Sequence, residues 1–259
     1  MPKRRSHELV VHFLRRGARG RLLDIPAGDG KISAAARELG WRVRELDLFP
    51  HPGLRGVLAD ACAPLPFRDA SFDALVCMEG IEHFEDQTGF LRECARVLKR
   101  GGRLVLTTPN ILHLSSRISG FWTGQRLMKQ GFVNEVSTTW MKNGDRIYHG
   151  HAYLIDAFRL RYILRVVGLK IVDLALSNPS AGSMFLAPLY PAVWAATRYA
   201  LVAGRKHEER HSKRAPSREI ERDLQRLALS PALLFGKKLV IVAERDSAGI
   251  PAAQPATSA

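Results

Sequence analysis

Three aspartates, Asp24, Asp47 and Asp60, each follow or end a short apolar run in the N-terminal part of the chain. Such runs are typical of buried parallel strands, whose carboxyl ends meet at one edge of a sheet. Carboxylates at that edge accept hydrogen bonds from the amino and hydroxyl groups of a ligand. The sequence therefore predicts a polar ligand site at the ends of these strands.

The segment after Asp24 contains small residues and then begins a helix. Pro26, Ala27, Gly28 and Gly30 precede the apolar-periodic stretch that starts with Lys31 and Ile32. Small residues let a bulky ligand approach the backbone, and glycine tolerates the positive φ that a tight turn needs. A strand, a glycine-containing loop and a helix N-terminus together favour a nucleotide-type cofactor.

Two common nucleotide motifs do not fit this loop. A G-x-G-x-x-G dinucleotide fingerprint starting at Gly28 requires glycine where Ser33 stands, and a P-loop requires Ser or Thr where Ile32 stands. Asp47 lies about 20 residues after the loop, at the end of the next predicted strand, where a carboxylate can bind both ribose hydroxyls. Glu45 is the competing candidate, but Asp47 is closer to the end of that strand.

The remaining pattern, Asp24-x-x-x-Gly28-x-Gly30, resembles motif I of the class I S-adenosylmethionine-dependent methyltransferases. Four further landmarks follow in the order of that family: Leu65-Pro66-Phe67, Ser71-Phe72-Asp73, Met78 to Phe84 with its acid-x-x-Glu-His sequence, and Leu98 to Leu106 with a double glycine. The resemblance covers residues 20–110. It implies S-adenosylmethionine as the cofactor and an α/β fold: a Rossmann-like, seven-stranded, mostly parallel sheet with helices on both faces and an antiparallel final strand.

The resemblance also implies roles for individual residues. Asp24 is expected to help hold the methionyl ammonium of the cofactor, and the loop after it to curl beneath the methionine portion of the cofactor. Asp60 is expected to reach the adenine amino group. Pro26 departs from the family pattern, which has its first glycine there. The expected cofactor site also includes neighbours of these residues, namely Ala27, Leu48, Ala61, Met78 and Glu79.

Histidines are the candidate catalytic residues. An alcohol acceptor benefits from a general base, and the segment after strand four borders the methyl group in this fold, so His83 is the first candidate and His151 the second. A structural role for His83 is the alternative. His149 and His151 are two residues apart, so in an extended segment both side chains point the same way and could form half of a metal site. The sequence shows no third ligand at the spacing that a metal site requires. We therefore expect structural or substrate contacts there and no metal.

The chain is predicted to form one methyltransferase domain over 1–245 and a disordered tail over 246–259. Residues 111–150 lack clear periodicity, which indicates a lid or substrate segment. Helical spacing returns over 153–167, and strands are predicted at 169–176 and 238–244. The long stretch between these strands, 177–237, is an insertion relative to the usual arrangement of the family.

The charge is strongly positive, with 39 Lys and Arg against 25 Asp and Glu. A basic amphipathic helix is predicted near the N-terminus from Leu9, Val10, Phe13 and Leu14, and it either contacts an anionic partner or leans on the fold. The apolar, aromatic segment 184–204 lies in an anionic membrane interface or closes the substrate pocket. No signal peptide or membrane-spanning run is evident, and the three cysteines have no metal spacing, so we expect a cytoplasmic protein. It is peripheral on the inner face of the cytoplasmic membrane if the segment 184–204 lies in the interface.

Short motifs narrow the expected acceptor. Thr107 to Leu112 and His149-Gly150-His151 resemble methyltransferases encoded with bacterial surface-polysaccharide and lipid-linked-sugar enzymes, which implies O-methylation of a sugar-bearing or lipid-linked acceptor. The alternative is a small molecule such as a quinone-type precursor. Nucleic acid is disfavoured because Cys77 to Gly80 lacks the Asn/Asp-Pro-Pro-aromatic sequence, and a non-catalytic scaffold because the three acids are retained. The sequence indicates no oligomeric state.

Overall fold

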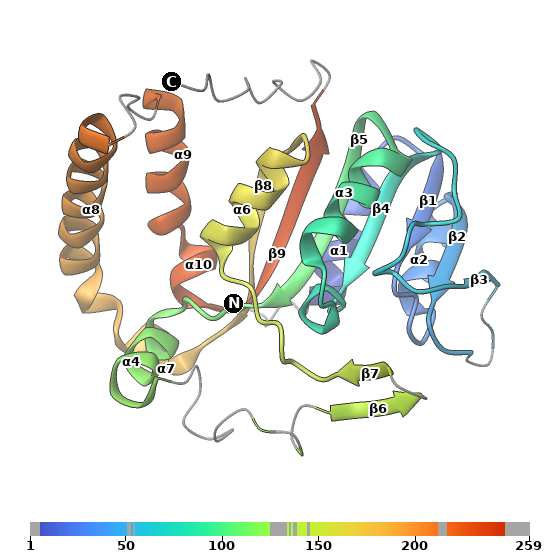
Figure 1. Cartoon of the computed structure of the whole chain (residues 1–259), viewed down its shortest axis with the longest axis horizontal. Coiled ribbons are helices and arrows are strands. Elements are labelled where there is room, and N and C mark those ends of the chain that lie inside the picture. Colours follow the sequence, from blue (N-terminus) through green and yellow to red (C-terminus); the bar gives the residue numbers. More distant parts are fainter. Residues whose placement is uncertain are drawn as a thin grey trace.

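The computed structural model describes residues 6–124, 134–211 and 217–246, apart from 51, 52, 54, 135, 137, 138, 144 and 145. Within this part of the chain, seven strands form one sheet in the order β3-β2-β1-β4-β5-β9-β8, and β6 pairs with β7 in a separate hairpin (Figure 1). The strands are β1 Arg21–Asp24, β2 Arg42–Asp47, β3 Val57–Leu58, β4 Phe72–Met78, β5 Leu98–Pro109, β6 Thr139–Asn143, β7 Arg146–His149, β8 Leu169–Pro179 and β9 Gly236–Arg245.

The direction of the strands matches the expected fold. β3, β2, β1, β4 and β5 are parallel neighbours, whereas β9 runs antiparallel to both β5 and β8. The final strand of the described chain thus enters the sheet between two earlier strands. The predicted seven-stranded, Rossmann-like sheet with an antiparallel final strand is confirmed.

Helices cover both faces of the sheet and bury two apolar cores. On one face, α1 (Ser6–Arg16) and α2 (Lys31–Glu38) pack over residues such as Leu22 and Val76. On the other face, α3 (Gln87–Val97), α6 (Ala157–Val166) and α10 (Pro231–Phe235) cover a larger core. Alternate residues of β4 and β5 enter opposite cores, as the two-residue period of a strand requires.

The order of the strands places a crevice between β1 and β4. After β1 the chain crosses to β2 on one side, and after β4 it crosses to β5 on the other. Ligands of open α/β sheets bind at the carboxyl ends of strands at such a reversal. The loop after Asp24 and the residues after Met78 both lie at this point, so the fold brings the two predicted halves of the cofactor site together.

The predicted insertion is helical. After β8 come α7 (Ala181–Phe185), the 3₁₀ turn η3 (Ala187–Leu189), α8 (Tyr190–His211) and α9 (Arg218–Ala228), and the last two pack against each other at the edge of the molecule beyond β8 (Figure 1). No residue of α8 is buried. Among the helices of the described residues, none combines the length and the apolar character that crossing a bilayer requires.

The N-terminal helix leans on the fold. Leu9, Val10 and Leu14 of α1 are buried, and α1 packs against α2, β5, β8 and β9. The apolar face of α1 therefore packs on the rest of the fold and is not available to an external partner. For this face, the second of the two interpretations of the helix is the right one. The basic residues at positions 3–5 and residues 247–259 of the predicted tail lie outside the described residues.

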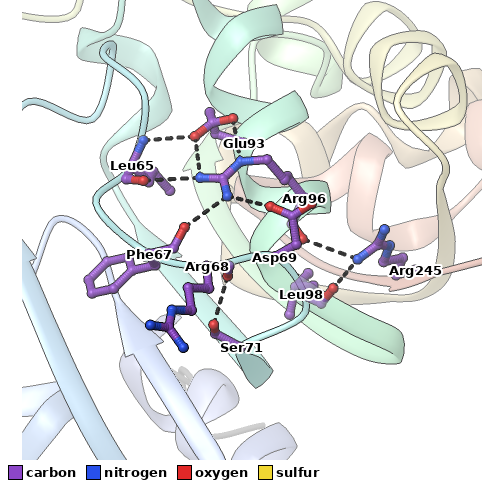
Figure 2. A network of polar contacts seen from close by, with 9 residues as sticks. All are labelled: Leu65, Phe67, Arg68, Asp69, Ser71, Glu93, Arg96, Leu98 and Arg245. Carbon is purple, nitrogen blue, oxygen red and sulfur yellow. Dashed lines mark hydrogen bonds and ion pairs between the residues drawn. The ribbon is translucent and has the colours of Figure 1, made fainter.

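One arginine fixes the loop that leads into β4. Arg96 of α3 donates to the carbonyl oxygens of Leu65 and Phe67 at 3.0 and 2.8 Å and to the carboxylates of Asp69 and Glu93, each at 2.7 Å (Figure 2). Glu93 in turn accepts from the Leu65 amide at 2.7 Å. These acidic partners raise the pKa of the Arg96 guanidinium. The loop after Asp60 is thereby tied to α3.

Replacing Arg96 by Gln removes these bonds while the carbonyls they satisfied remain partly buried. We expect the free energy of unfolding to fall by about 1–3 kcal/mol, the cost of unsatisfied hydrogen-bonding groups. Denaturant unfolding followed by circular dichroism measures the change. Arg92→Gln, at an exposed position of the same helix, is the matched control and should change stability by less than about 0.5 kcal/mol. Equal effects of the two substitutions would contradict the assigned role of Arg96.

Candidate functional site

The loop after β1 adopts the tight turn that its glycines predict. Gly28 and Gly30 have φ values of 54° and 72°, in the left-handed region that favours glycine. A Cβ atom at Gly80 would lie 2.4 Å from Cδ of Pro26, so only glycine lets the segment after β4 approach the loop this closely. Gly30 also precedes α2, which begins at Lys31 as predicted.

Asp24 is buried at the end of β1, with its side chain 1% exposed. Ser33 of α2 donates its hydroxyl to Oδ2 of Asp24 at 2.7 Å. Burial raises the pKa of Asp24 from 3.8 to about 7; the Ser33 hydrogen bond lowers it, and repulsion from Glu45 raises it further. Ser33, which excluded a dinucleotide fingerprint, is thus the polar partner of the first carboxylate. A positive group near Asp24 would offset the cost of burying its charge.

The structure separates the two acids at the end of β2. Asp47 lines a cavity, and its carboxylate accepts from the amides of Gly28 and Phe49 at 2.8 and 3.0 Å. Glu45 is buried and engaged elsewhere, with Arg37 at 2.5 Å and the Arg55 amide at 2.6 Å. Of the two candidates for the ribose, only Asp47 reaches the cavity.

Two adjoining cavities, of about 500 and 560 Å³, lie at the carboxyl edge of the sheet. Pro26, Gly28, Met78 and Glu79 line both of them. The structure therefore places the loop after β1 and the segment after β4 between these two cavities, as a wall of each.

The other predicted cofactor residues divide between these cavities. Those that line the 500 Å³ cavity are Asp47, Leu48, Asp60 and Ala61, together with the catalytic candidate His83. Asp24 and Ala27 line the adjoining cavity. Gly30 and His151 line neither cavity. Gly30 shapes the turn before α2, and His151 adjoins the site by packing against His83.

A further cavity, of about 610 Å³, lies at the opposite edge of the sheet. Trp41, Asp73, Lys99 and Gly101 line it, at the amino ends of β4 and β5 and the turns beside them. Parallel sheets bind ligands at their carboxyl edge, and none of the predicted site residues reaches this cavity. Its larger volume therefore does not make it the site.

His83 lies in the 3₁₀ turn η1 (Ile81–His83) after β4. Its Nδ1 is 2.9 Å from the carbonyl oxygen of His149 and 3.1 Å from that of Gly150. A carbonyl only accepts, so Nδ1 carries the proton, and the lone pair of the neutral ring is on Nε2. The ring of His151 packs beside it, with centroids 5.1 Å apart. His83 and His151 are therefore brought together, as neighbours.

His149 and His151 do not act as a pair. His149 Nε2 is 3.0 Å from the carboxylate of Glu85, and the Tyr153 hydroxyl is 3.3 Å from the same nitrogen, whereas His151 packs on His83. The extended segment on which half a metal site would depend is not formed, because β7 ends at His149 and a turn follows.

Glu82, which the sequence analysis did not single out, is the most buried acid of this segment, with no exposed surface. Thr108 donates to its Oε2 at 3.2 Å, and Oε1 has no hydrogen-bond partner among the described residues. Burial and the neighbouring charge of Glu79 raise the pKa of Glu82 to about 7. The acid-x-x-Glu-His sequence was the signal for it, since it includes both acids.

The segment 111–150 contributes residues to the site near its end. Tyr148 and His149 of β7 line the 500 Å³ cavity, and the Tyr148 ring packs edge-to-face on Phe49 at 5.5 Å. The segment begins as helix α4 (Leu114–Thr123), and the residues at 125–133, including Met128, lie outside the described part of the chain. A lid role for the segment stays a prediction.

The family model of a methyltransferase domain matches residues 23–106, from the end of β1 into β5. This range contains the loop, both strand-end acids and the Glu-His turn. The chain carries a class I methyltransferase domain. S-adenosylmethionine is its cofactor, as the resemblance of the loop implied.

Curated relatives match about a third of the chain. The ubiquinone biosynthesis O-methyltransferase of Xanthomonas oryzae pv. oryzae is 36% identical over 108 residues, which cover 36% of this chain and 44% of the relative. The enzyme of the same name from Xanthomonas axonopodis pv. citri is 39% identical over 106 residues, with the same coverage. The match thus spans less than half the length of these relatives.

Solved structures share the fold over nearly the whole chain. A Listeria monocytogenes protein described as a putative S-adenosylmethionine-dependent methyltransferase has a TM-score of 0.52 and 11% identity, covering 93% of this chain and 97% of its own. A SAM-dependent methyltransferase from Archaeoglobus fulgidus has a TM-score of 0.50 and 17% identity, covering 92% and 94%. At these identities the likeness shows the fold of the methyltransferase domain.

The described residues fit S-adenosylmethionine in charge and in shape. Asp24 is a buried carboxylate whose ionised form a cationic group would stabilise, and Asp47 and Asp60 line the neighbouring space. A Cβ at Gly28 would meet no atom within 4 Å, so the loop leaves open space beside the turn. The assignment of the ammonium to Asp24, the ribose to Asp47 and the adenine to Asp60 stays a prediction.

The pKa of Asp24 makes the stability of the cofactor-free domain depend on pH. Folded Asp24 titrates near 7 and its usual value is 3.8, so between these values the folded state keeps a proton that the unfolded state releases. Its contribution to the free energy of unfolding therefore falls as pH rises from about 4 to about 7, and is constant above. Asp24→Asn removes this dependence.

We expect the stability of Asp24→Asn relative to the wild type to rise by up to about 4 kcal/mol over that window. Urea unfolding at a series of pH values measures it. The control Asp29→Asn has the opposite sign, because Lys31 lowers the pKa of the exposed Asp29 and its charge stabilises the fold above its pKa. A pH-independent difference between Asp24→Asn and wild type would contradict the raised pKa.

Proposed function

We propose that the protein transfers the methyl group of S-adenosylmethionine to a hydroxyl oxygen of a small molecule of the quinone-precursor type. The carrying observation is the lining of the 500 Å³ cavity, in which Phe49, Phe84 and Tyr148 accompany His83. Aromatic walls suit a flat, apolar acceptor. The similarity of about a third of the chain to enzymes named ubiquinone biosynthesis O-methyltransferase supports the same class of acceptor over the sugar-bearing one.

The residues of the chain supply position and proton transfer. The sulfonium of S-adenosylmethionine supplies an activated methyl group. Methyl transfer is an in-line displacement, so the protein must align the acceptor oxygen with the methyl carbon and exclude water. His83 lies on the cavity wall with Nδ1 held by two carbonyls, which leaves Nε2 as the basic nitrogen for the acceptor hydroxyl. We assign His83 as the base or orienting residue.

A second candidate acceptor is lipid-linked, because the helical insertion exposes an apolar surface. Met184, Phe185, Leu189 and Trp194 are 46–84% exposed on α7, η3 and α8. Helix α4, which packs against α7, adds two aromatic residues, Phe121 at 81% and Trp122 at 73%. We call these six residues the aromatic surface. Apolar side chains at the depth of lipid headgroups bind membranes peripherally.

The cations beside this surface are partly engaged within the protein. Arg205 forms an ion pair with Glu221 of α9. Arg198 lies 3.5 Å from the amide oxygen of Gln225, and Lys206 is exposed. The cationic contribution to membrane binding therefore comes from fewer side chains than the sequence indicated, and the aromatic surface carries most of this proposal.

The function is tested by incubating the protein with S-adenosylmethionine and a series of quinone-precursor phenols and catechols. We expect one product heavier by one CH₂, detected by mass spectrometry. His83→Ala should lower kcat by about 10²–10⁴ with unchanged cofactor affinity, because the base acts in the transition state. His12→Ala, on α1, is the control. Methylation of envelope glycans with none of these phenols would instead favour the sugar-bearing acceptor.

Peripheral membrane binding is tested by sedimentation with anionic vesicles at low and high salt. We expect the wild type to pellet at low salt and the double variant Phe185→Ser and Trp194→Ser to remain largely in the supernatant. Salt should weaken but not abolish binding, since charge interactions are screened within about 8 Å and apolar burial is not. The control pair Val172→Ser and Tyr162→Ser removes exposed apolar groups elsewhere. Equal pelleting of both double variants would overturn the assignment.

A further inference from the structure

The first turn of α1 forms part of the wall of the cavity of about 560 Å³. His7 and Glu8 line this cavity together with Asp24 and the loop after β1. Both residues precede the range 23–106 that the family model matches. A helix outside the matched range therefore borders the end of the site at which the ammonium group of the cofactor is expected.

The start of α1 is fixed to the sheet. Ser6 is buried, and its Oγ lies 2.9 Å from Oγ of Ser177 in β8. Leu9 and Val10, within one turn after His7, are buried as well. Contacts on both sides of His7 thus hold its backbone in place, and its side chain reaches the cavity from a helix that is packed against the sheet.

One nitrogen of the His7 ring has no partner within the described part of the chain. Nε2 is buried there and makes no hydrogen bond. A buried polar atom in this state is costly, and such atoms usually have a partner in water, an ion or a ligand. Rotation of the ring about its Cβ–Cγ bond, a torsion with broad wells, puts a carbon in the covered position and makes the nitrogen available to a ligand. His7 therefore offers an unused hydrogen-bonding group on the wall of the cavity.

The loop after β1 spends its own amides within the protein. The bonds run from Ala27 to the carbonyl of Leu46, from Gly28 to Asp47, from Gly30 to the carbonyl of Ala27 and from Lys31 to Asp29, at 2.8–3.2 Å. These amides are therefore not available to an anionic group of a ligand.

Two side chains on the wall of this cavity can donate a hydrogen bond, those of His7 and Lys31. The ammonium of Lys31 pairs with the carboxylate of Asp29. This hydrogen bond and, as the smallest cause, the charge of His7 lower the pKa of Asp29, which shows that the ring lies near the loop. Of the two donors on this wall, His7 is the one without a partner among the described residues.

The cofactor brings two opposite charges to this end of the site. The ammonium and the carboxylate of its methionine portion are attached to the same carbon atom, so an ammonium at Asp24 brings the carboxylate into the same cavity. The acids that line this cavity repel a carboxylate, which therefore needs a hydrogen-bond donor of its own. This step rests on the predicted placement of the ammonium at Asp24.

We propose that His7 binds the methionyl carboxylate of S-adenosylmethionine. Asp24, at the end of β1, then holds the positive end of the methionine portion, and α1 holds the negative end from the opposite side. Two fixed points orient this portion and with it the sulfonium, whose methyl group must point at the acceptor. The proposal concerns the cofactor alone, so it is independent of which acceptor receives the methyl group.

The test compares two ligands by calorimetry, S-adenosylmethionine and its decarboxylated form, which keeps the ammonium and the sulfonium. His7→Ala should weaken binding of S-adenosylmethionine about ten-fold or more, as expected for a lost hydrogen bond to a charged group, and change the affinity for the decarboxylated form less than about two-fold. His7→Gln, which keeps an N–H donor, should restore part of the difference. The matched control is His12→Ala, which removes an exposed imidazole from the same helix and should leave both affinities unchanged.

Asp24→Asn distinguishes the two ends of the methionine portion. This variant should weaken both ligands, because both carry the ammonium, whereas His7→Ala should weaken one. The ratio of the two affinities is measured within a single variant, so a partial loss of folded protein does not change it. Equal losses for both ligands in His7→Ala, or no loss for either, would overturn the role of His7. Unchanged binding of both ligands to Asp24→Asn would overturn the placement of the ammonium on which the proposal rests.

Discussion

Negative charge held in a poorly solvated crevice is the constraint on which the rest of this site depends. The parallel sheet ends β1, β2 and β4 at the same edge, so their acids converge there, and burial raises the pKa of both Asp24 and Glu82 to about 7. The partners within the fold, Ser33 and Thr108, are neutral hydroxyls. The chain thus stabilises the shape of the crevice but leaves the neutralisation of its charge to positively charged ligands.

The antiparallel strand β9 supplies a positive charge that neutralises one of the acids after β4. β9 lies beside β5 and carries Lys238, which pairs with Glu79, a residue that lines both cavities. Thr107 of β5 also donates to this carboxylate, at 2.8 Å. Glu79 has a φ of 52°, an uncommon value for a residue with a side chain, and these two contacts fix it in place. Of the two acids after β4, Glu79 is thus neutralised by a lysine of the fold, whereas the described partner of Glu82 is a neutral hydroxyl.

Local patterns predicted the features that depend on neighbours in sequence. The turn at Gly28 and Gly30 and the start of α2 follow from residue types and short spacings, and the structure confirms them. The antiparallel direction of β9 was implied by the family resemblance, and it is confirmed as well. The approach of His151 to His83 was not predictable, because it depends on hydrogen bonds from Gln87 and Tyr153 that join separate segments. The exposure of α8 was also not predictable from the sequence, because its apolar residues do not mark a single buried face.

The position of β9 has a consequence for biosynthesis. β5 pairs with β9 along most of its length, yet every helix from α4 to α10 is translated between them. A nascent chain that has completed the region 23–106 therefore displays β5 as an open edge with unpaired amides and carbonyls. Until β9 leaves the ribosome, that edge can pair with another chain, an exposure that a fold whose strands pair in order of synthesis avoids.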